Sequence, residues 1–417
     1  MPRPKSTTAV TTDAPAKPAL PKGWQWVRFG DVVRQVQTKA DPQTSGVERY
    51  VAGEHMDTDD LRIRRWGTIG DHYLGPAFHR RFEAGQILYG SRRTYLRKVA
   101  VAEWPGICAN TTFVIEARKG TVIVPEILPW IMSSEAFHDY SIRNSKGSVN
   151  PYINFSDLVD YEFALPSDPA EQRRIADLLR AADDAVEAWR EVAGRTNVLR
   201  NSLIAGMSSR KRAESASGKM RPGWTYEPLG NRYTIQLGKM MSPEAVNGES
   251  KRPYMRNANV QWNRLDLSDV AEMHFDDDEV AKFELKPGDI LACEGRHVGK
   301  SAIWRGEIPG ACFQKALHRL RPKSSTDLPE YLLLCLWDCE LTGRFKQLIG
   351  ETTIPHLPAE RFRELHMAFP PRDEQAEFVK LIGQVDADRS AAFDHANRER
   401  AILEQLSHLL LTPPETP

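Results

Sequence analysis

The 417-residue sequence contains no uninterrupted run of 18 apolar residues and therefore predicts no membrane-spanning helix. The first 21 residues also lack the apolar centre of a secretory signal. They are rich in Pro, Thr, Ala and Lys and predict a disordered basic tail. Only five cysteines occur, and an odd number without a signal peptide indicates a reducing cytoplasm and no disulfide framework.

Metal and nucleotide motifs are also scarce. Cys335 and Cys339 lie four residues apart in an apolar run without further ligands at zinc spacing, which favours buried thiols. Neither H-E-x-x-H nor G-x-S-x-G occurs, and no methyltransferase motif is found. Residues 295–301 (GRHVGKS) resemble a phosphate-binding loop, but only three residues separate the two glycines where that loop needs four. We interpret this segment as a basic turn.

The formal net charge is zero, which is unusual for a nucleic-acid-binding protein, although the distribution of charge matters more than its sum. Six basic residues lie close together in the sequence with only Glu83 among them. They are Arg80, Arg81, Arg92, Arg93, Arg97 and Lys98. The acidic residues 276–279 lie far away along the chain. A positive surface is therefore compatible with the neutral sum.

The most informative feature present is an internal repeat. Residues 23–26 (GWQW) return as 223–226 (GWTY), and 82–88 (FEAGQIL) return as 285–291 (LKPGDIL). PGIC at 105–108 returns as PGAC at 309–312. The offset stays between 200 and 204 along the sequence, which indicates a duplicated architecture.

Each repeat has the same internal order. Short β-prone runs, such as 86–89, 98–102 and 112–117, are followed by a helical segment that begins near Pro125 or Pro329. A long helix then closes each half. We predict an α+β protein with a tail at 1–21 and two mixed α/β domains separated by two long helices. The predicted domains are 22–165 and 223–369, the helices 166–207 and 370–412, and the polar linker 208–222.

Both long helices carry a seven-residue apolar period, which is typical of helices that wrap around one another. In the first helix one seam runs through Ile175, Leu179, Ala182, Val186, Trp189 and Ala193. A second seam runs through Leu178, Ala185, Val192, Leu199 and Leu203. The second helix repeats the period through Phe378, Ile382, Val385, Ala392, Ala396, Leu403, Leu406 and Leu410. Each helix packing on its own domain is the alternative; we favour a mutual coiled coil.

Polar and basic loops recur at equivalent places of the two repeats, which favours DNA binding because Arg, Asn and Thr side chains reach phosphates and base edges. The first-half candidates are Arg92, Arg93, Tyr95, Lys146, Ser148, Asn150 and Tyr152. The second-half candidates are Arg256, Asn257, Asn259, Arg296, His297, Lys300, Thr352, Thr353 and His356. No catalytic or metal-binding residue is predicted.

Two similar halves that each end in a helix opening with Glu-Gln resemble the specificity subunit of Type I restriction–modification systems. The openings are Glu171-Gln172 and Glu374-Gln375, and the resemblance covers roughly residues 22–412. It implies two target-recognition domains that read a split sequence in double-stranded DNA and an antiparallel coiled coil that sets their spacing. It further implies two methyltransferase subunits and restriction–translocase subunits as partners, with the four Glu and Gln residues near those partners.

In that family S-adenosylmethionine and ATP with Mg²⁺ belong to the partner subunits, so the resemblance implies no cofactor and no catalysis in this chain. Three alternatives stay open on sequence alone. One is a related Type IIB-like or phage-defence methylation complex with the same kind of subunit. The others are a scaffold whose repeats bind protein and a nucleotide-binding enzyme that uses residues 295–301.

Overall fold

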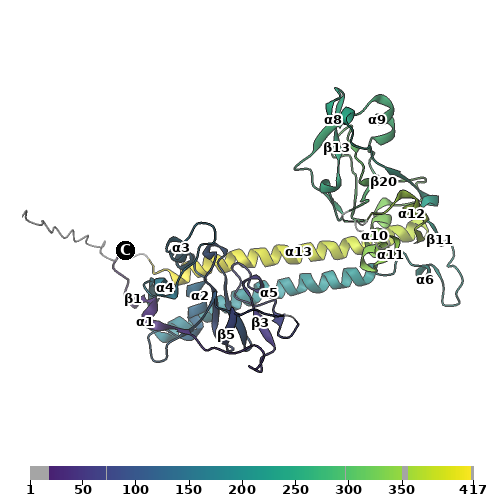
Figure 1. Cartoon of the computed structure of the whole chain (residues 1–417). Helices are drawn as coiled ribbons and strands as arrows, with labels where there is room; N and C mark the ends of the chain where they lie inside the picture. The colour runs from purple at the N-terminus through teal and green to yellow at the C-terminus, as the bar shows by residue number, and fades with distance from the viewer. Residues whose placement is uncertain (1–17, 72, 296, 350–355, 415–417) are drawn as a thin grey trace, which may run out of the picture. The chain divides into compact units, whose positions relative to one another are not determined.

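The computed structural model describes residues 18–71, 73–295, 297–349 and 356–414. They divide into two compact units (Figure 1). Unit 1 comprises the described residues up to Ala188 and from His395 onward, and unit 2 comprises Trp189–Asp394. The fold is mixed α/β, as the sequence predicts.

Unit 1 is built on two four-stranded sheets and one two-stranded ribbon. The first sheet has the order β2 (Val33–Val36), β9 (Thr112–Ala117), β6 (Ile87–Gly90) and β7 (Val99–Val101). The second has the order β4 (Gly67–Thr68), β3 (Arg49–Val51), β8 (Gly106–Ala109) and β5 (Phe78–Phe82). The ribbon pairs β1 (Trp24–Arg28) with β10 (Glu162–Pro166).

Unit 2 repeats the first sheet and the closing ribbon of this topology, whereas its second sheet has three strands and a short extra ribbon is present. Its first sheet has the order β12 (Tyr233–Leu237), β20 (Leu317–Pro322), β17 (Ile290–Cys293) and β18 (Ser301–Ile303). Its second has the order β16 (Ala271–His274), β13 (Lys251–Met255) and β19 (Cys312–Phe313). The ribbons are β11 (Thr225–Pro228) with β21 (His366–Phe369) and β14 (Val260–Gln261) with β15 (Arg264–Leu265). Each unit contains a parallel pair, β3·β8 and β13·β19, which supports the duplication; the registers differ by one residue, because Cys108 pairs with Val51 and Cys312 with Tyr254.

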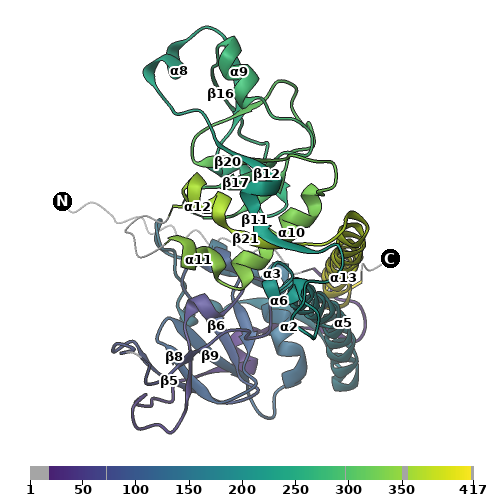
Figure 2. The ribbon, with the colours of Figure 1, turned by 90° about the vertical axis from the view of Figure 1, so that its right-hand side faces the viewer.

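Short helices cover the sheets. In unit 1 they are α1 (Phe29–Val32), η1 (Gly53–His55), η2 (Thr94–Leu96), η3 (Pro125–Ile127), α2 (Leu128–Met132), α3 (Glu135–Arg143) and α4 (Phe155–Leu158). In unit 2 they are α6 (Arg210–Ala213), α7 (Leu229–Arg232), α8 (Pro243–Asn247), η4 (Asn257–Asn259), α9 (Asp277–Phe283), α10 (Pro329–Leu341), α11 (Arg344–Ile349) and α12 (Ala359–Glu364). Pro125 and Pro329 begin helical segments as predicted, because proline lacks only an N–H that has no partner there. Residues of α10 and α12 share a core with β12, β17 and β20 (Figure 2).

The long helices are α5 (Pro169–Ile204) and α13 (Arg372–Leu411), which lie side by side (Figure 1). In unit 1 the first turns of α5 share a core with the last turns of α13, through Leu179 and Leu403. In unit 2 the end of α5 contacts the beginning of α13, where Arg389 donates to Asn197 at 3.0 Å. The start of one helix lies beside the end of the other in both contacts, so the two helices are antiparallel. The first predicted seam is thus confirmed as the packed face.

The second predicted seam of α5 is wrong. Four of its members are exposed: Leu178 (43%), Val192 (45%), Leu199 (52%) and Leu203 (37%). A single partner helix covers only one face of α5 and leaves this stripe outside. All five cysteines are buried and free; the sequence predicts this burial for Cys335 and Cys339. Among the described residues, no helix is long and apolar enough to cross a membrane.

His138 in α3 is buried at 1% exposure, and neither ring nitrogen has a hydrogen-bond partner among the described residues. Asp59 lies 3.9 Å from its Nε2 atom, too far for a hydrogen bond. Burial, and secondly the charge of Arg97, lower the pKa of His138 from 6.5 to about 4. The unfolded chain therefore binds the proton more tightly than the folded unit does.

Unit 1 should consequently lose stability as the pH falls from about 6.5 toward 4, by on the order of 3 kcal/mol. Above pH 6.5 this group contributes no pH dependence, since His138 is neutral in both states. Urea titrations of the full chain between pH 4 and 7.5, followed by hydrogen exchange in unit 1, measure the effect. His138→Leu should flatten this slope, whereas His408→Leu, at an exposed position, should leave it. An unchanged slope in His138→Leu would contradict the assignment.

Candidate nucleic-acid interface

In unit 1 the structure brings together the two loops singled out in the sequence. The chain leaves β6 into residues 91–95, and the loop 146–152 pairs with it through an Arg92–Tyr152 bridge. The backbone N–H of Arg93 donates to Pro151 at 2.5 Å, and that of Ile153 donates to Ser91 at 3.0 Å. These bonds fix two loops that are more than 50 residues apart in the chain as one surface.

The side chains of this surface project outward. Arg92, Arg93 and Tyr95 are exposed, with Tyr95 at 51%. The Arg92 guanidinium lies 5.8 Å from the centre of the Tyr152 ring, a cation–π distance that orients both groups. Arg93 has a left-handed backbone (φ 50°).

The far end of the surface is the turn 146–152, where Ser148 and Asn150 are exposed. Lys146 forms an ion pair with Asp157 at 2.8 Å, so its charge is partly compensated. Beside Arg93, burial and secondly the charge of Arg93 lower the pKa of Lys98. The surface offers uncompensated guanidinium groups, hydroxyls and an amide, the donors suited to phosphates and base edges.

Unit 2 has the same arrangement. After β17, Gly295 forms a bridge with His356, and Leu357 N–H donates to the carbonyl of Glu294 at 2.8 Å. Gly295 lies 203 residues after Arg92, and His356 lies 204 residues after Tyr152. The two bridges therefore match within the offset of the repeat. Asn257 donates to Gly295 at 3.2 Å, which joins the turn 256–259 to the same surface.

His297 and His356 are exposed at this surface, and Lys300 donates to Gln261 at 3.1 Å. Gln261 therefore belongs to the surface although the sequence did not single it out; only its contact with Lys300 reveals it. The predicted residues Arg296, Thr352 and Thr353 lie outside the described residues.

The basic turn joins two antiparallel strands, β17 and β18, and no helix follows it. A phosphate-binding loop leads into a helix whose N-terminal amides hold the phosphate, so this geometry does not support nucleotide binding. Within the described part of the chain, no three His, Cys, Asp or Glu side chains are placed to hold a metal ion.

Two further candidates of unit 2, Asn259 and Arg256, form contacts within the unit. Asn259 is 2% exposed, accepts from the Arg256 N–H at 3.0 Å and donates to the carbonyls of Asp266 and Asp269. Its amide shapes the turn, and this burial does not support the contact with DNA that the sequence suggests. Arg256 forms an ion pair with Asp269, so its charge is compensated.

The Glu-Gln helix openings also differ from their prediction. Gln172 is fully buried: it accepts from Val124 N–H and donates to the carbonyls of Val122 and Pro166, each at 2.8 Å. Gln375 repeats the pattern with the N–H of Leu328 and the carbonyls of Thr326 and Pro370. This geometry gives both glutamines an internal structural role in place of the partner contact that the sequence suggests.

The two glutamates of these openings are only half-buried. Arg174 holds the pKa of Glu171 below its usual value through a hydrogen bond at 2.7 Å. Glu374 accepts from the Trp224 indole N–H at 3.0 Å. Both glutamates keep surface within reach of a partner.

Comparisons with known proteins agree with this architecture. Residues 226–393 match the family described as "Type I restriction modification DNA specificity domain". A curated relative, the Type I restriction enzyme EcoDI specificity subunit of Escherichia coli, is 26% identical over 242 residues, which are 56% of this chain. The chain is thus similar to Type I restriction–modification specificity subunits. It spans about half the length of that relative, 52%.

Solved structures share the fold of this chain. A chain from a study of complex assembly and conformational transition of the type I R-M system has a TM-score of 0.63 at 19% identity and covers 95% of this chain and 98% of that chain. The S subunit of a Type I restriction–modification system from M. genitalium has a TM-score of 0.51 at 14% identity, with 94% and 97% covered.

Proposed function

We propose that this chain is a non-catalytic, DNA-binding specificity subunit that recognises a bipartite target in double-stranded DNA. The observation that carries the proposal is the matched pair of loop surfaces. In each unit a loop that follows the third strand of the first sheet is bridged to a loop that precedes the closing ribbon strand. Loops held by sheets are the usual place for recognition residues. Two similar surfaces on one chain suit a split sequence, each unit reading one half.

Linking two modest binding surfaces in one chain raises the overall affinity, because the second contact becomes intramolecular. The antiparallel helices α5 and α13, each of which contributes residues to both units, form the connection. We propose that they set the gap between the two half-sites, since paired helices are stiffer than a flexible linker.

We further propose that two methyltransferase subunits and the restriction–translocase subunits assemble on this chain in the cytoplasm. S-adenosylmethionine, ATP and Mg²⁺ are then bound by those partners. The exposed stripe of Leu178, Val192, Leu199 and Leu203 supports the proposal, because apolar side chains that recur along one face of a helix suit a further helix. A Type IIB-like complex would contain the same kind of subunit.

The test uses the chain in complex with its methyltransferase subunits and the target found by sequencing methylated host DNA. The double change Arg92→Ala and Arg93→Ala should weaken binding about tenfold or more, because two exposed guanidinium groups are lost. Selectivity should relax at one half-site only. The change is measured by selecting bound duplexes from a library randomised in both half-sites.

Arg180→Ala, which removes an exposed arginine on α5 with an Asp177 partner, is the matched control and should leave both half-sites unchanged. Relaxation of both half-sites by the double variant would contradict independent reading by the two units. Salt-insensitive binding without any preferred duplex would favour the protein scaffold instead.

A further inference from the structure

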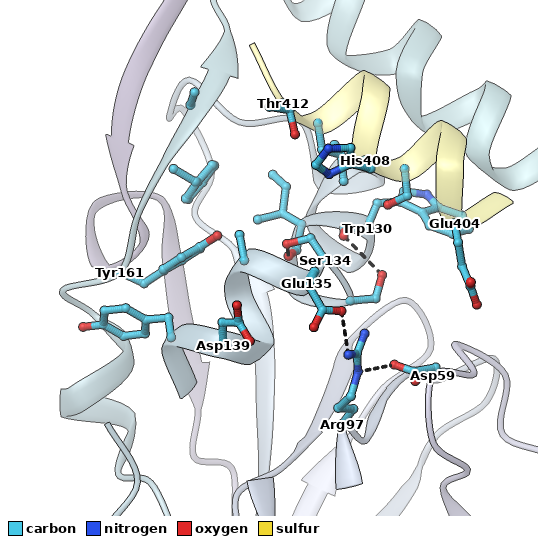
Figure 3. A pocket seen from close by; sticks show the side chains of 18 of the residues that line it. Asp59, Arg97, Trp130, Ser134, Glu135, Asp139, Tyr161, Glu404, His408 and Thr412 are labelled. Atoms are coloured by element: carbon cyan, nitrogen blue, oxygen red, sulfur yellow. Dashed lines mark hydrogen bonds and ion pairs between the residues drawn. The ribbon is translucent and has the colours of Figure 1, made fainter. Parts of the chain in front are cut away.

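Unit 1 contains a groove of about 960 Å³ between helix α3, strand β10 and the end of helix α13 (Figure 3). Trp26, Trp130 and Leu403 contribute apolar surface to its lining. Thr412 and Pro413, which follow α13, also line it. The loops proposed to read DNA contribute no residue to this lining.

Unit 2 fills the equivalent place with its own chain. Beyond α5, the Gly206 and Ser208 N–H groups donate to the Asp338 carboxylate at 2.7 and 2.9 Å. The Ser208 carbonyl accepts from the Ala368 N–H at 3.0 Å, and the Arg210 guanidinium lies 6.0 Å from the ring centre of Tyr226. Ser208 and Ala213 are fully buried, although the sequence predicted a linker here. Residues 206–213 are therefore a docked segment.

The groove of unit 1 is this docking place without its segment. Three residues that hold the segment in unit 2 have repeat equivalents that line the groove. Tyr226, Asp338 and Ala368 correspond, at offsets of 200, 204 and 204, to Trp26, Ser134 and Ala164. The strand registers agree, since Tyr226 pairs with Ala368 and Trp26 pairs with Ala164.

The length of the helix explains why the groove stays open. Helix α5 ends at Ile204, and Gly206 turns the chain with a φ of +81°, which favours glycine. Gln172 and Gln375 lie 203 residues apart. At the same offset, the residue of α13 equivalent to Gly206 is Leu409. Helix α13 continues through that position to Leu411. Within the described residues, which end at Pro414, the chain therefore places no segment equivalent to residues 206–213 in the groove.

Charge indicates what the groove accepts. Its lining includes seven carboxylates and three arginines. The carboxylates are Asp59, Glu135, Asp139, Asp160, Glu162, Asp183 and Glu404. Arg28 and Arg62, outside the lining, pair with two of these carboxylates, so the groove keeps an excess of two negative charges. The segment docked in unit 2 has the sequence SSRKRA at 208–213, with three consecutive basic residues. An acidic groove with apolar walls is complementary to such a segment.

We propose that the unit 1 groove binds a basic segment of a partner subunit, with small polar residues followed by Arg and Lys, in the manner of residues 206–213 in unit 2. The partner completes in unit 1 the contact that the chain makes for itself in unit 2. The proposal rests on the proposed function in one respect, namely that the chain works within a complex.

The experiment uses a fluorescein-labelled peptide, GMSSRKRAE, which is the sequence of residues 206–214. Because the intact chain already fills the unit 2 site, the peptide should bind the full chain saturably at unit 1, as measured by fluorescence anisotropy at low salt. Asp139→Lys with Glu404→Lys should weaken binding about tenfold, since two attractions become repulsions. The peptide GMSSAAAAE should lose binding to a similar extent.

The control is Glu54→Lys with Asp177→Lys, which changes the net charge equally at two exposed carboxylates outside the groove and should leave the affinity unchanged. Addition of the purified partner subunits should release the peptide. No saturable binding, equal weakening by the control pair, or retention of the peptide in the assembled complex would each overturn the proposal. So would tenfold tighter binding after deletion of residues 2–17, because the chain's own N-terminal segment would then be the occupant.

DNA selectivity of the same assembled complexes is measured separately. Loss of a preferred duplex with peptide release intact would contradict the proposed function and leave the groove assignment. A preferred duplex with the peptide retained would contradict only the groove assignment.

Discussion

Replacing Asp386 with alanine is expected to lower the free energy of unfolding of unit 2 by about 3–5 kcal/mol. Asp386 accepts from the Nε of Arg200 at 2.7 Å where α13 packs on α5, and the arginine side chain is only 5% exposed. The Arg200 guanidinium also lies 4.5 Å from the ring centre of Trp337. Without Asp386 the arginine is left as a buried charge that lacks its carboxylate.

Urea unfolding of the full chain, with hydrogen exchange to assign the change to unit 2, measures this loss. Asp388→Ala, at an exposed position two residues away, is the matched control and should cost less than about 0.5 kcal/mol. Arg200→Met combined with Asp386→Leu should recover most of the stability, since an apolar pair leaves no uncompensated charge. A loss from Asp386→Ala no larger than that from Asp388→Ala would show that the ion pair does not stabilise the helix contact.

Gln375→Met is expected to destabilise unit 2 by about 2–4 kcal/mol, and Gln172→Met should do the same to unit 1. Methionine keeps much of the shape of glutamine but offers neither the amide acceptor nor its donors. In each unit one backbone N–H and two carbonyls then lose their hydrogen bonds near the start of a long helix.

The controls are Glu377→Met and Arg173→Met, which introduce methionine at exposed positions on the same helices. Hydrogen exchange should show each glutamine variant loosening its own unit. If Gln172→Met and Gln375→Met instead left stability intact but abolished assembly with the methyltransferase subunits, the partner contact suggested by the sequence would be restored.

A Glu-Gln pair at the helix start has two separate tasks in this chain. The glutamine joins the helix to the preceding domain, and the glutamate stays half-buried at the surface, where Glu171 contacts Arg174 and Glu374 contacts Trp224. Variants of the two residues should therefore differ, with stability affected by the glutamine.

The sequence by itself determined the duplication, the mixed α/β class, the positions of the long helices and the burial of Cys335 and Cys339. These features depend on local composition, on apolar periods and on offsets between repeats, all of which can be read along the chain. The paired loops of each unit were also predictable, because polar segments such as 91–95 and 146–152 recur at the repeat offset.

Only the tertiary structure decided which side chains of those segments are available. In the sequence, Asn259, Gln172 and Gln375 cannot be told apart from exposed Asn and Gln residues, because the amide group is the same. Their burial against backbone carbonyls results from the packing of segments that are distant in the chain. The two apolar seams of α5 are likewise equivalent in sequence until one partner helix covers one of them. The open groove is also decided by the structure, because it depends on where each long helix ends. Helix α5 ends at Ile204 and the chain then fills the site in unit 2, whereas α13 continues to Leu411.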